Sequence, residues 1–416
     1  MYQAPRGTQD ILPEEQAYWR YVEQKAADIA RLYGYERIDT PVFEDANLFV
    51  RGVGEGTDIV EKEMYTFTDR GNERMTLRPE GTAPVCRAYI EHGMYNLTQP
   101  VKLYYIAPIF RYERPQAGRF RQHHQFGCEA FGEADPALDA ETIDMAWQFF
   151  SSLGLKNLTL QVNSIGCTTC RPGYVKTLVE YYQQHVSELC PECQARILRN
   201  PLRLLDCKKP LCRQVALNAP GSIDYLCREC GEHFEKLRHY LSVLNLPYHV
   251  DHRLVRGLDY YTRTVFEIQP EIEGAQSTIG GGGRYDNLIE ELGGKPTPAV
   301  GFGSGIERII LNLKRQGIVV PRIKKPEVFF AWLGENARDE ALRQTALLRK
   351  NGIGAVFSIV GKSLKAQLRQ ANSLGVEYAA IIGDDELKMG CVILRHMNSG
   401  KQEKVVFSDL AEKLKT

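Results

Sequence analysis

Residues 110–129, FRYERPQAGRFRQHHQFGCE, place four arginines, at positions 111, 114, 119 and 121, around one early carboxylate, Glu113. Such a density of charge is unsuited to a hydrophobic core. The stretch follows an apolar run, Leu103 to Phe110, so Arg111 is expected at the end of a strand. A planar guanidinium that is always charged can hold a phosphate there through two parallel hydrogen bonds. The stretch therefore predicts a polyphosphate site.

Other segments far along the chain carry related signals. Residues 299–308, AVGFGSGIER, predict a Gly-rich strand and a turn into an apolar helix, with Arg308 on the first turns of the helix and facing back toward the strand. Between them stand LVRGLDYYTRTVFEI at 254–268 and GGGGRYD at 280–286, while RGTQDIL occupies 6–12. The chain has no G-x-x-x-x-G-K-[ST] loop, and GVGEGT at 52–57 lacks the lysine and is equally well explained as a loop. Phosphate binding is therefore expected to depend on arginines.

Residues 110–129 and 299–308 resemble motif 2 and motif 3 of the class II aminoacyl-tRNA synthetases. The segments at 6–12, 254–268 and 280–286 resemble those that mark histidyl-tRNA synthetases within that class. The resemblance covers essentially the whole chain in the family's order. It implies an α+β fold with a class II synthetase-like antiparallel sheet and helices, a helical Cys-rich insertion, and a C-terminal α/β domain that resembles an anticodon-binding domain.

The resemblance also implies an activity. Such an enzyme activates L-histidine with ATP and Mg²⁺ to histidyl-adenylate and then transfers the histidine to the 3′ end of tRNA(His). Arg111 should hold the α-phosphate and the substrate carboxylate, Glu113 should accept from the adenine amine, and Arg308 should reach the γ-phosphate. Arg256 is assigned to the α-phosphate in the transition state. A homodimer is implied as well, because the helix and the Pro41-containing strand near the N-terminus resemble motif 1.

Selection of histidine is a hydrogen-bonding problem, because neutral imidazole carries one donor and one acceptor. A site that pairs both nitrogens rejects apolar isosteres, which leave buried groups unpaired. By resemblance, Glu129 and Tyr261 face the imidazole, Glu80, Thr82 and Gln125 face the α-amino group, and Tyr285 closes the pocket. Taken alone, Tyr260 and Tyr261 are more often core aromatics and Glu80 a helix-cap acid. His123 and His124 are better explained as part of a basic strand that touches solvent or RNA than as general bases.

Eight of the eleven cysteines fall between positions 167 and 230. They form the pairs Cys167/Cys170, Cys190/Cys193, Cys207/Cys212 and Cys227/Cys230. Without a secretion signal, C-x-x-C pairs favour a structural zinc site over disulfides. Reduced structural thiols in a variable insertion are an equally good explanation.

Composition is ordinary for a globular protein, with 43% apolar and 25% charged residues. Lysine plus arginine and aspartate plus glutamate both total 52, so RNA contacts must come from local patches such as 111–121 and Arg322 with Lys324 and Lys325. No apolar stretch approaches the ~20 residues of a membrane span, and the N-terminus lacks a signal-peptide core. We therefore expect a cytoplasmic protein without a membrane partner.

Strand-like runs recur between residues 64 and 302 and alternate with few long helices, which favours a largely antiparallel sheet. Pro13 with two glutamates is expected to open a helix that Gly34 ends. Residues from about 165 to 246 form a helical, Cys-rich insertion, and a basic linker spans 313–326. Beyond it a βαβαβ pattern with a further strand and helix predicts a partly parallel sheet. The predicted domains are a catalytic domain at 1–325 and an anticodon-binding domain at 326–416.

Two alternatives remain open. One is a histidine-sensing regulatory subunit of ATP phosphoribosyltransferase, whose members resemble the catalytic domain but lack the C-terminal domain and lose the ATP motifs. The other is a class II synthetase for glycine, proline or threonine, against which RGLDYY and GGGGRYD argue.

Overall fold

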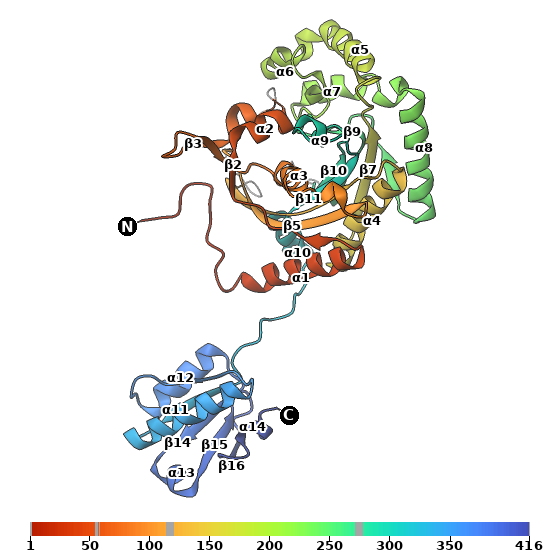
Figure 1. Ribbon diagram of the computed structural model, residues 1–416. Helices are drawn as coiled ribbons and strands as arrows, with labels where there is room; N and C mark the ends of the chain where they lie inside the picture. The colour runs from red at the N-terminus through yellow and green to blue at the C-terminus, as the bar shows by residue number, and fades with distance from the viewer. Residues whose placement is uncertain (1, 55–56, 58, 114–119, 271–277, 416) are drawn as a thin grey trace. The chain divides into compact units, whose positions relative to one another are not determined.

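The computed structural model describes residues 2–54, 57, 59–113, 120–270 and 278–415. By its contacts the chain divides into two compact units, Met1–Pro321 and Arg322–Thr416. Each unit is built around its own sheet (Figure 1). In the described part of the chain, no helix is both long and apolar enough to cross a membrane.

An eight-stranded sheet forms the centre of the first unit. Its order is β1 (Glu36–Arg37), β5 (Val101–Phe110), β6 (Gln122–Phe131), β11 (Ala299–Gly305), β10 (Gly280–Arg284), β9 (Thr262–Pro270), β7 (Leu158–Ser164) and β8 (Tyr248–Val250). The pairs from β5 through to β7 are antiparallel, and the outermost pairs, β1 with β5 and β7 with β8, are parallel. The prediction of a largely antiparallel sheet is confirmed.

The two faces of this sheet have different coverings. Helices α1 (Gln16–Leu32), α4 (Pro136–Ser152) and α10 (Ile306–Arg315) contribute to one core with Phe126, Cys128 and Ala130 of β6 (Figure 1). The intervening β6 residues, including Gln125 and Glu129, therefore point to the other face, because side chains alternate along a strand. On that face lie α3 (Thr82–Glu91) and α9 (Leu288–Glu291). A small three-stranded sheet lies there too, in the order β2 (Phe43–Asp45), β4 (Arg74–Leu77) and β3 (Tyr65–Thr68). Helix α2 (Ala46–Val53) directly follows β2 in the chain.

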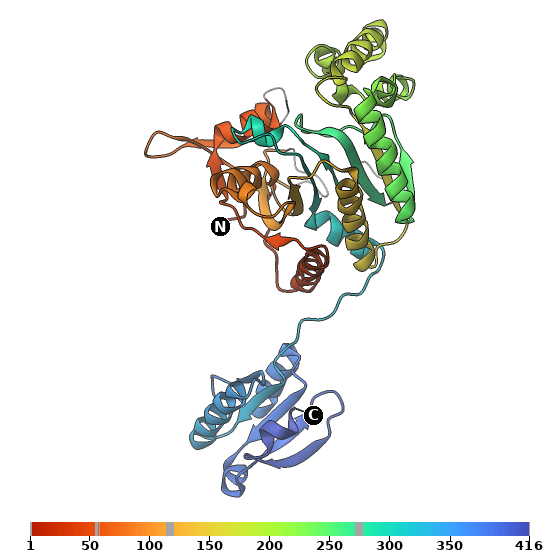
Figure 2. The ribbon, with the colours of Figure 1, turned by 45° about the vertical axis from the view of Figure 1, so that its right-hand side comes forward.

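The chain between β7 and β8 is helical. It contains α5 (Arg171–Gln184), α6 (Pro191–Arg196), α7 (Pro210–Leu217) and α8 (Arg228–Val243). Helix α8 packs against α4, and Figure 2 brings this side of the unit forward.

In the second unit, the sheet order is β13 (Ala355–Phe357), β12 (Val328–Trp332), β14 (Tyr378–Ile382), β15 (Cys391–His396) and β16 (Gln402–Val406). Strand β12 is parallel to both neighbours, and the last two pairs are antiparallel. Helix α12 (Leu364–Leu374) packs near Phe329 and Ala331, and α11 (Glu335–Lys350) near the alternate residues of β12. Both faces of β12 are thus buried, which is why it reads as an unbroken apolar run. Helices α13 (Asp384–Met389) and α14 (Leu410–Lys413) complete the unit.

The sequence missed or misplaced a few elements. Pro13 lies in a turn, and α1 begins at Gln16. Strand β16 and helix α13 were not predicted, because most of β16 is exposed and polar and no residue of α13 is buried. Neither presents the apolar period that identifies an element in a sequence.

A buried ionic cluster joins β10, α4 and α8. Arg284 Nε donates to the two carboxylate oxygens of Asp139 at 3.2 and 3.0 Å. His233 Nε2 lies 3.2 Å from Asp139 Oδ1. Burial opposes ionisation of Asp139, but the guanidinium of Arg284 outweighs it and holds the pKa of that carboxyl well below its usual range.

We predict that Asp139→Ala lowers the free energy of unfolding by about 3–5 kcal/mol, because the buried Arg284 guanidinium loses its buried carboxylate and keeps only the partly exposed Asp286, at 3.2 Å, as an ion-pair partner among the described residues. A depressed carboxyl pKa stabilises the folded state above the unfolded pKa of ~4 and loses that effect as the pH falls further. The difference between wild type and variant should therefore be constant from pH 7 to 5 and shrink below about pH 4. Urea titrations measure it, with Glu232→Ala in the exposed pair with Arg228 as the control, expected to cost under about 1 kcal/mol. Equal losses in the two variants would contradict the role of the cluster.

Candidate active site

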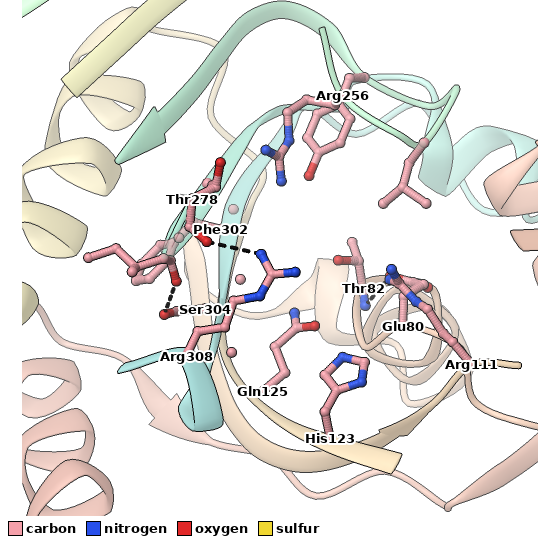
Figure 3. Close-up of a pocket in the computed structure, with 18 of the residues that line it drawn as sticks. Glu80, Thr82, Arg111, His123, Gln125, Arg256, Thr278, Phe302, Ser304 and Arg308 are labelled. Carbon is pink, nitrogen blue, oxygen red and sulfur yellow. Dashed lines mark hydrogen bonds between the residues drawn. The ribbon is translucent and has the colours of Figure 1, made fainter. Parts of the chain in front are cut away.

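One pocket opens on the face of the large sheet opposite α1 and α10. All ten residues that the sequence predicted to contact ATP or histidine line it: Glu80, Thr82, Arg111, Glu113, Gln125, Glu129, Arg256, Tyr261, Tyr285 and Arg308. They come from the start of α3 and the segment before it, the ends of β5 and β10, the length of β6, the segment before β9, and the start of α10. Figure 3 shows several of them around one open space.

Glycines on β11 make the floor of this pocket. A Cβ on Gly301 would stand 2.0 Å from Glu129 Oε2, and one on Gly303 would stand 2.1 Å from Gln125 Nε2. No side chain fits at such distances, so β11 must be bare where β6 presents its polar groups. The alternation of glycine in AVGFGSG therefore has a steric reason.

Glu129 is the most buried acid of the pocket, with 1% of its surface exposed. Its Oε1 accepts from Thr82 Oγ1 at 2.8 Å and from the Tyr105 hydroxyl at 3.4 Å, and its Oε2 accepts from the Tyr285 hydroxyl. Burial raises the pKa of Glu129 to about 8, although the hydroxyl donors oppose the shift. At pH 7 this carboxyl is therefore largely protonated in the pocket without ligand.

Glu80 has a structural contact as well as a place in the pocket. Its two oxygens accept from the backbone N–H groups of Thr82 and Ala83 at 2.7 and 2.8 Å, at the start of α3. The interpretation as a helix-cap acid is thus correct for these bonds. Burial raises the pKa of Glu80.

Three guanidinium groups enter the pocket from separate segments. Arg111 Nε donates to the carbonyl of Pro79 at 2.7 Å, and its Nη1 lies 3.9 Å from Glu113 Oε1. Arg308 Nη1 donates to the carbonyl of Thr278 at 3.0 Å.

Arg256, the third guanidinium, forms an ion pair with Glu267 and lies 5.9 Å from the centre of the Tyr261 ring. Its buried Nε has no hydrogen-bond partner among the described residues. A guanidinium carries five donor hydrogens, so the contacts described for Arg111 and Arg256 leave donors for a ligand.

His123 is half-buried and faces the pocket. It lines the pocket, and burial together with the charges of Arg111 and Arg308 lowers its pKa to about 3, so the imidazole is neutral at pH 7. His124 is also partly buried, with Nδ1 3.0 Å from Glu307 Oε1 and its ring against Trp19. The alternation of β6 could have revealed the difference between the two, since His123 shares its face with Gln125 and Glu129.

Sequence reasoning did not assign Tyr105 or Tyr260 to the site. The Tyr105 hydroxyl accepts from Gln125 Nε2 at 3.0 Å and donates to Glu129, so it links two pocket residues. In the sequence Tyr105 stands in an apolar run and reads as core. Tyr260, considered only as a core aromatic, lines the pocket and packs at 4.7 Å from Tyr261 and 5.5 Å from Tyr285 between ring centres.

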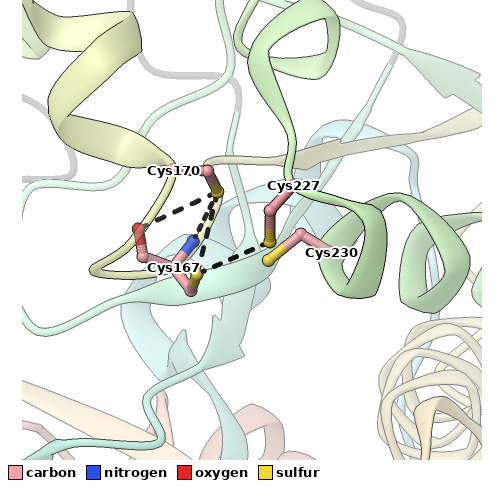
Figure 4. Close-up of side chains that lie close together, drawn as sticks. All are labelled: Cys167, Cys170, Cys227 and Cys230. Carbon is pink, nitrogen blue, oxygen red and sulfur yellow. Dashed lines mark hydrogen bonds between the residues drawn. The ribbon is translucent and has the colours of Figure 1, made fainter.

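The cysteine pairs assemble into two clusters that could hold metal ions. One contains Cys167, Cys170, Cys227 and Cys230, and the other contains Cys190, Cys193, Cys207 and Cys212. Within each cluster the sulfurs all lie within 4.8 Å of one another (Figure 4 shows the first). Cys167 Sγ is 3.8 Å from Cys170 Sγ and 3.9 Å from Cys227 Sγ. Tetrahedral zinc with Zn–S bonds of ~2.3 Å requires sulfurs about 3.8 Å apart, so this cluster has the necessary size.

Some predicted contacts fall outside the described residues. These are Arg114, Gln116, Gly118 and Arg119 of the arginine-rich loop, and Glu55 and Gly56 of the Gly-rich segment. Arg121 is described, and its guanidinium lies 3.9 Å from the centre of the Tyr112 ring.

Comparison with known proteins identifies the family of this chain. The family model described as histidyl-tRNA synthetase matches residues 7–170 and 213–309. The chain belongs to the histidyl-tRNA synthetase family. The model described as anticodon binding domain matches residues 319–416. The stretch that the first model leaves unmatched, 171–212, contains α5, α6 and the start of α7, with four of the clustered cysteines: Cys190, Cys193, Cys207 and Cys212.

Full-length relatives agree with this family. A histidine–tRNA ligase of Dehalococcoides mccartyi (strain ATCC BAA-2266 / KCTC 15142 / 195) is 62% identical over 415 residues, covering 100% of this chain and 99% of that protein. A histidine–tRNA ligase of Pelotomaculum thermopropionicum is 53% identical over 411 residues, covering 99% of this chain and 97% of that protein. The crystal structure of apo S. aureus histidyl-tRNA synthetase has 39% sequence identity and a TM-score of 0.84, with both chains fully covered.

The raised pKa of Glu129 predicts a pH-dependent stability. A carboxyl whose folded pKa is about 8 stabilises the fold fully below the unfolded value of ~4.3 and loses that contribution as the pH rises through 8. Glu129→Gln cannot ionise, so between pH 5 and 8 the variant should gain stability relative to wild type by up to about 1.4 kcal/mol per pH unit. Urea titrations at several pH values measure this, with the exposed Glu14→Gln as control. Parallel curves for wild type and Glu129→Gln would contradict the shift.

Proposed function

We propose that this protein is the histidine–tRNA ligase of its cell: it activates L-histidine with ATP to histidyl-adenylate and transfers the histidine to the 3′ end of tRNA(His). The observation that carries the proposal is the meeting of three guanidinium groups with a buried, hydroxyl-bonded carboxylate in one pocket. The guanidinium groups suit a triphosphate, and the buried carboxylate suits an imidazole. The full-length relatives named histidine–tRNA ligase support the same activity.

For ATP, we assign the phosphates to the arginines. Arg111 binds the α-phosphate and the histidine carboxylate, Arg308 the γ-phosphate, and Glu113 accepts from the adenine amine. The attacking carboxylate forms the new bond to the α-phosphorus, and pyrophosphate leaves with the electrons of the broken bond. Arg256 stabilises the charge that develops on the α-phosphate, since preorganised donors lower the barrier most where charge appears. Mg²⁺, when bound with ATP, neutralises the phosphates.

For histidine, we assign Glu129 and Tyr261 to the imidazole. Glu80, Thr82 and Gln125 face the α-amino group, and Tyr285 closes the pocket while holding Glu129. Glu129 can exchange its proton with the ligand, because its pKa of about 8 lies within about two units of the ~6.5 of an unperturbed histidine imidazole. An apolar isostere would leave these buried groups unpaired, which disfavours it strongly.

Further assignments follow from the family. We propose a cytoplasmic homodimer whose catalytic domain spans residues 1–325 and whose anticodon-binding domain spans 326–416. Neutral His123 is not required as a base in transfer, because the phosphate of the adenylate can take the ribose proton. The arginine-rich loop at 114–121 is assigned to the tRNA acceptor end.

We also assign structural zinc to the eight clustered cysteines. Two groups of four thiols, with sulfur separations that suit tetrahedral zinc, fit that ion better than isolated reduced thiols. This proposal extends the expectation of one zinc-stapled insertion to two separate sites.

The activity is tested by ATP–pyrophosphate exchange with labelled pyrophosphate. We expect exchange that depends on histidine and is absent with glycine, proline or threonine. A protein that binds histidine without any exchange would instead be a regulatory subunit, and exchange driven by another amino acid would identify a synthetase of different specificity. Either result would contradict the proposal.

Arg256 offers a sharper test of the mechanism. We predict that Arg256→Ala slows exchange by at least ~10²–10³-fold, the usual cost of removing a donor to developing charge. Arg253→Ala is the matched control, because Arg253 lies in the same segment but pairs with Asp251 and does not line the pocket. We expect its exchange rate to stay within about threefold of wild type. Near-normal exchange by Arg256→Ala would refute the assigned role.

A further inference from the structure

The two cysteine clusters occupy different places in the fold. We call Cys167, Cys170, Cys227 and Cys230 the base cluster, because Cys167 follows β7 closely and Cys227 precedes α8. We call Cys190, Cys193, Cys207 and Cys212 the tip cluster, because these residues lie around α6 and α7, within the insertion.

The base cluster is tied to the backbone beside Tyr261. The N–H of Ile165 donates to the carbonyl of Arg263 at 2.8 Å, and the N–H of Arg263 donates to the carbonyl of Gly166 at 2.9 Å. Arg171, which directly follows Cys170, donates to the carbonyls of Tyr261 and, at 3.1 Å, of Gly166. The turn that carries Cys167 and Cys170 therefore holds the chain on both sides of Thr262.

That part of the chain has an unusual conformation. Arg263 has φ of 48°, a left-handed value that an L-residue with a side chain rarely adopts. Such a conformation persists only where the surroundings hold it, and the two backbone bonds to Ile165 and Gly166 supply that hold. Tyr261, two residues earlier, lines the pocket.

The other half of the base cluster reaches the same strand. Cys227 and Cys230 lie at the start of α8, whose His233 contacts Thr264 Oγ1 at 3.3 Å and Asp139 at 3.2 Å. Cys167 and Cys170 come from the turn before α5, and Cys227 and Cys230 from the start of α8 (Figure 4). A metal ion that joined these two halves would hold residues 261–264 between them. Gly166 leaves the necessary room, since a Cβ there would stand 2.7 Å from Cys170 Sγ.

The tip cluster has a weaker connection to the pocket. The N–H of Cys190 donates to Cys212 Sγ at 3.2 Å, a bond within the insertion. Cys193 and Cys212 pack in a hydrophobic core with Leu189 and Ile197 that continues as far as Tyr261, so among the described residues the tip cluster reaches the pocket through apolar packing and not through a bond to the pocket backbone. Asn200, between the tip cysteines, reaches Asp259 through an exposed side-chain bond of 3.3 Å.

We infer that metal bound by the base cluster is a positioning element for the histidine pocket, holding Tyr261 through Arg171 and the Arg263 bend, whereas metal at the tip cluster only stabilises the insertion. The inference rests on the proposed function, because its consequence is an altered affinity for histidine. The thiolates act as positioning groups and touch no substrate.

Two matched substitutions test this. Cys170 and Cys190 are both half-buried, and each is the residue before a helix, α5 and α6 respectively, so Cys170→Ser and Cys190→Ser make equivalent changes. Wild type should contain two equivalents of zinc and each variant one, by elemental analysis. By calorimetry, Cys170→Ser should weaken histidine binding at least ~10-fold, the lower end of the cost of removing a supporting group at a metal site, and Cys190→Ser should weaken it less than about threefold. In pyrophosphate exchange, Cys170→Ser should raise KM for histidine more than KM for ATP.

Arg171→Ala separates the clamp from the folding of the insertion. It should keep both zinc equivalents and still weaken histidine binding, because it removes the bond to the carbonyl of Tyr261 without touching a thiol. Cys170→Ser that loses zinc but binds histidine normally would overturn the inference, as would an equal loss of affinity in Cys190→Ser. Zinc below one equivalent in wild type with normal histidine binding would overturn this inference alone. Two zinc equivalents without histidine binding would overturn the proposed function as well.

Discussion

The close approach of β6 and β11 is the constraint on which the site depends. Gly301 and Gly303 face Glu129 and Gln125 at distances that exclude even a methyl group. The sheet can therefore carry large polar side chains on one strand only because the neighbouring strand carries none. This arrangement buries Glu129 beside Tyr105 and Tyr285, and the burial in turn raises the pKa of Glu129. The two glycines thus make room for Glu129, and the burial that results sets the pKa of the carboxyl assigned to the imidazole.

The pocket has a nearly neutral region and a cationic region, and the two are separated in space. Around Glu129 the groups are buried, hydroxyl-rich and nearly neutral. Toward Arg111 and Arg308 the groups are cationic, and their charge also helps to keep His123 neutral. Strand β6 connects the two regions, since His123, Gln125 and Glu129 follow one another along the same face. A substrate with an imidazole at one end and a carboxylate at the other matches this gradient along one strand.

The sequence was most informative where chemistry is local. Arg111 follows an apolar strand and Arg308 opens an amphipathic helix, so both could be placed from neighbouring residues, and the family resemblance brought them to one site. The sequence was least informative about contacts between residues that lie far apart along the chain. The spacing of the cysteines cannot reveal that the first pair joins the last, because this depends on the path of α5 through α8. The bond of Arg284 to Asp139 and the link of Tyr105 to Gln125 likewise join segments that only the fold brings together. Exposed elements such as α13 escaped because they bury nothing.

The most direct test of the account is a crystal structure with a non-hydrolysable analogue of histidyl-adenylate. We predict the imidazole within hydrogen-bonding distance of Glu129 and Tyr261, and the oxygens that replace the α-phosphate within reach of Arg111 and Arg256. An imidazole bound elsewhere, or phosphate-like oxygens that contact none of the three pocket arginines, would contradict the central claim that this one pocket reads histidine and ATP together.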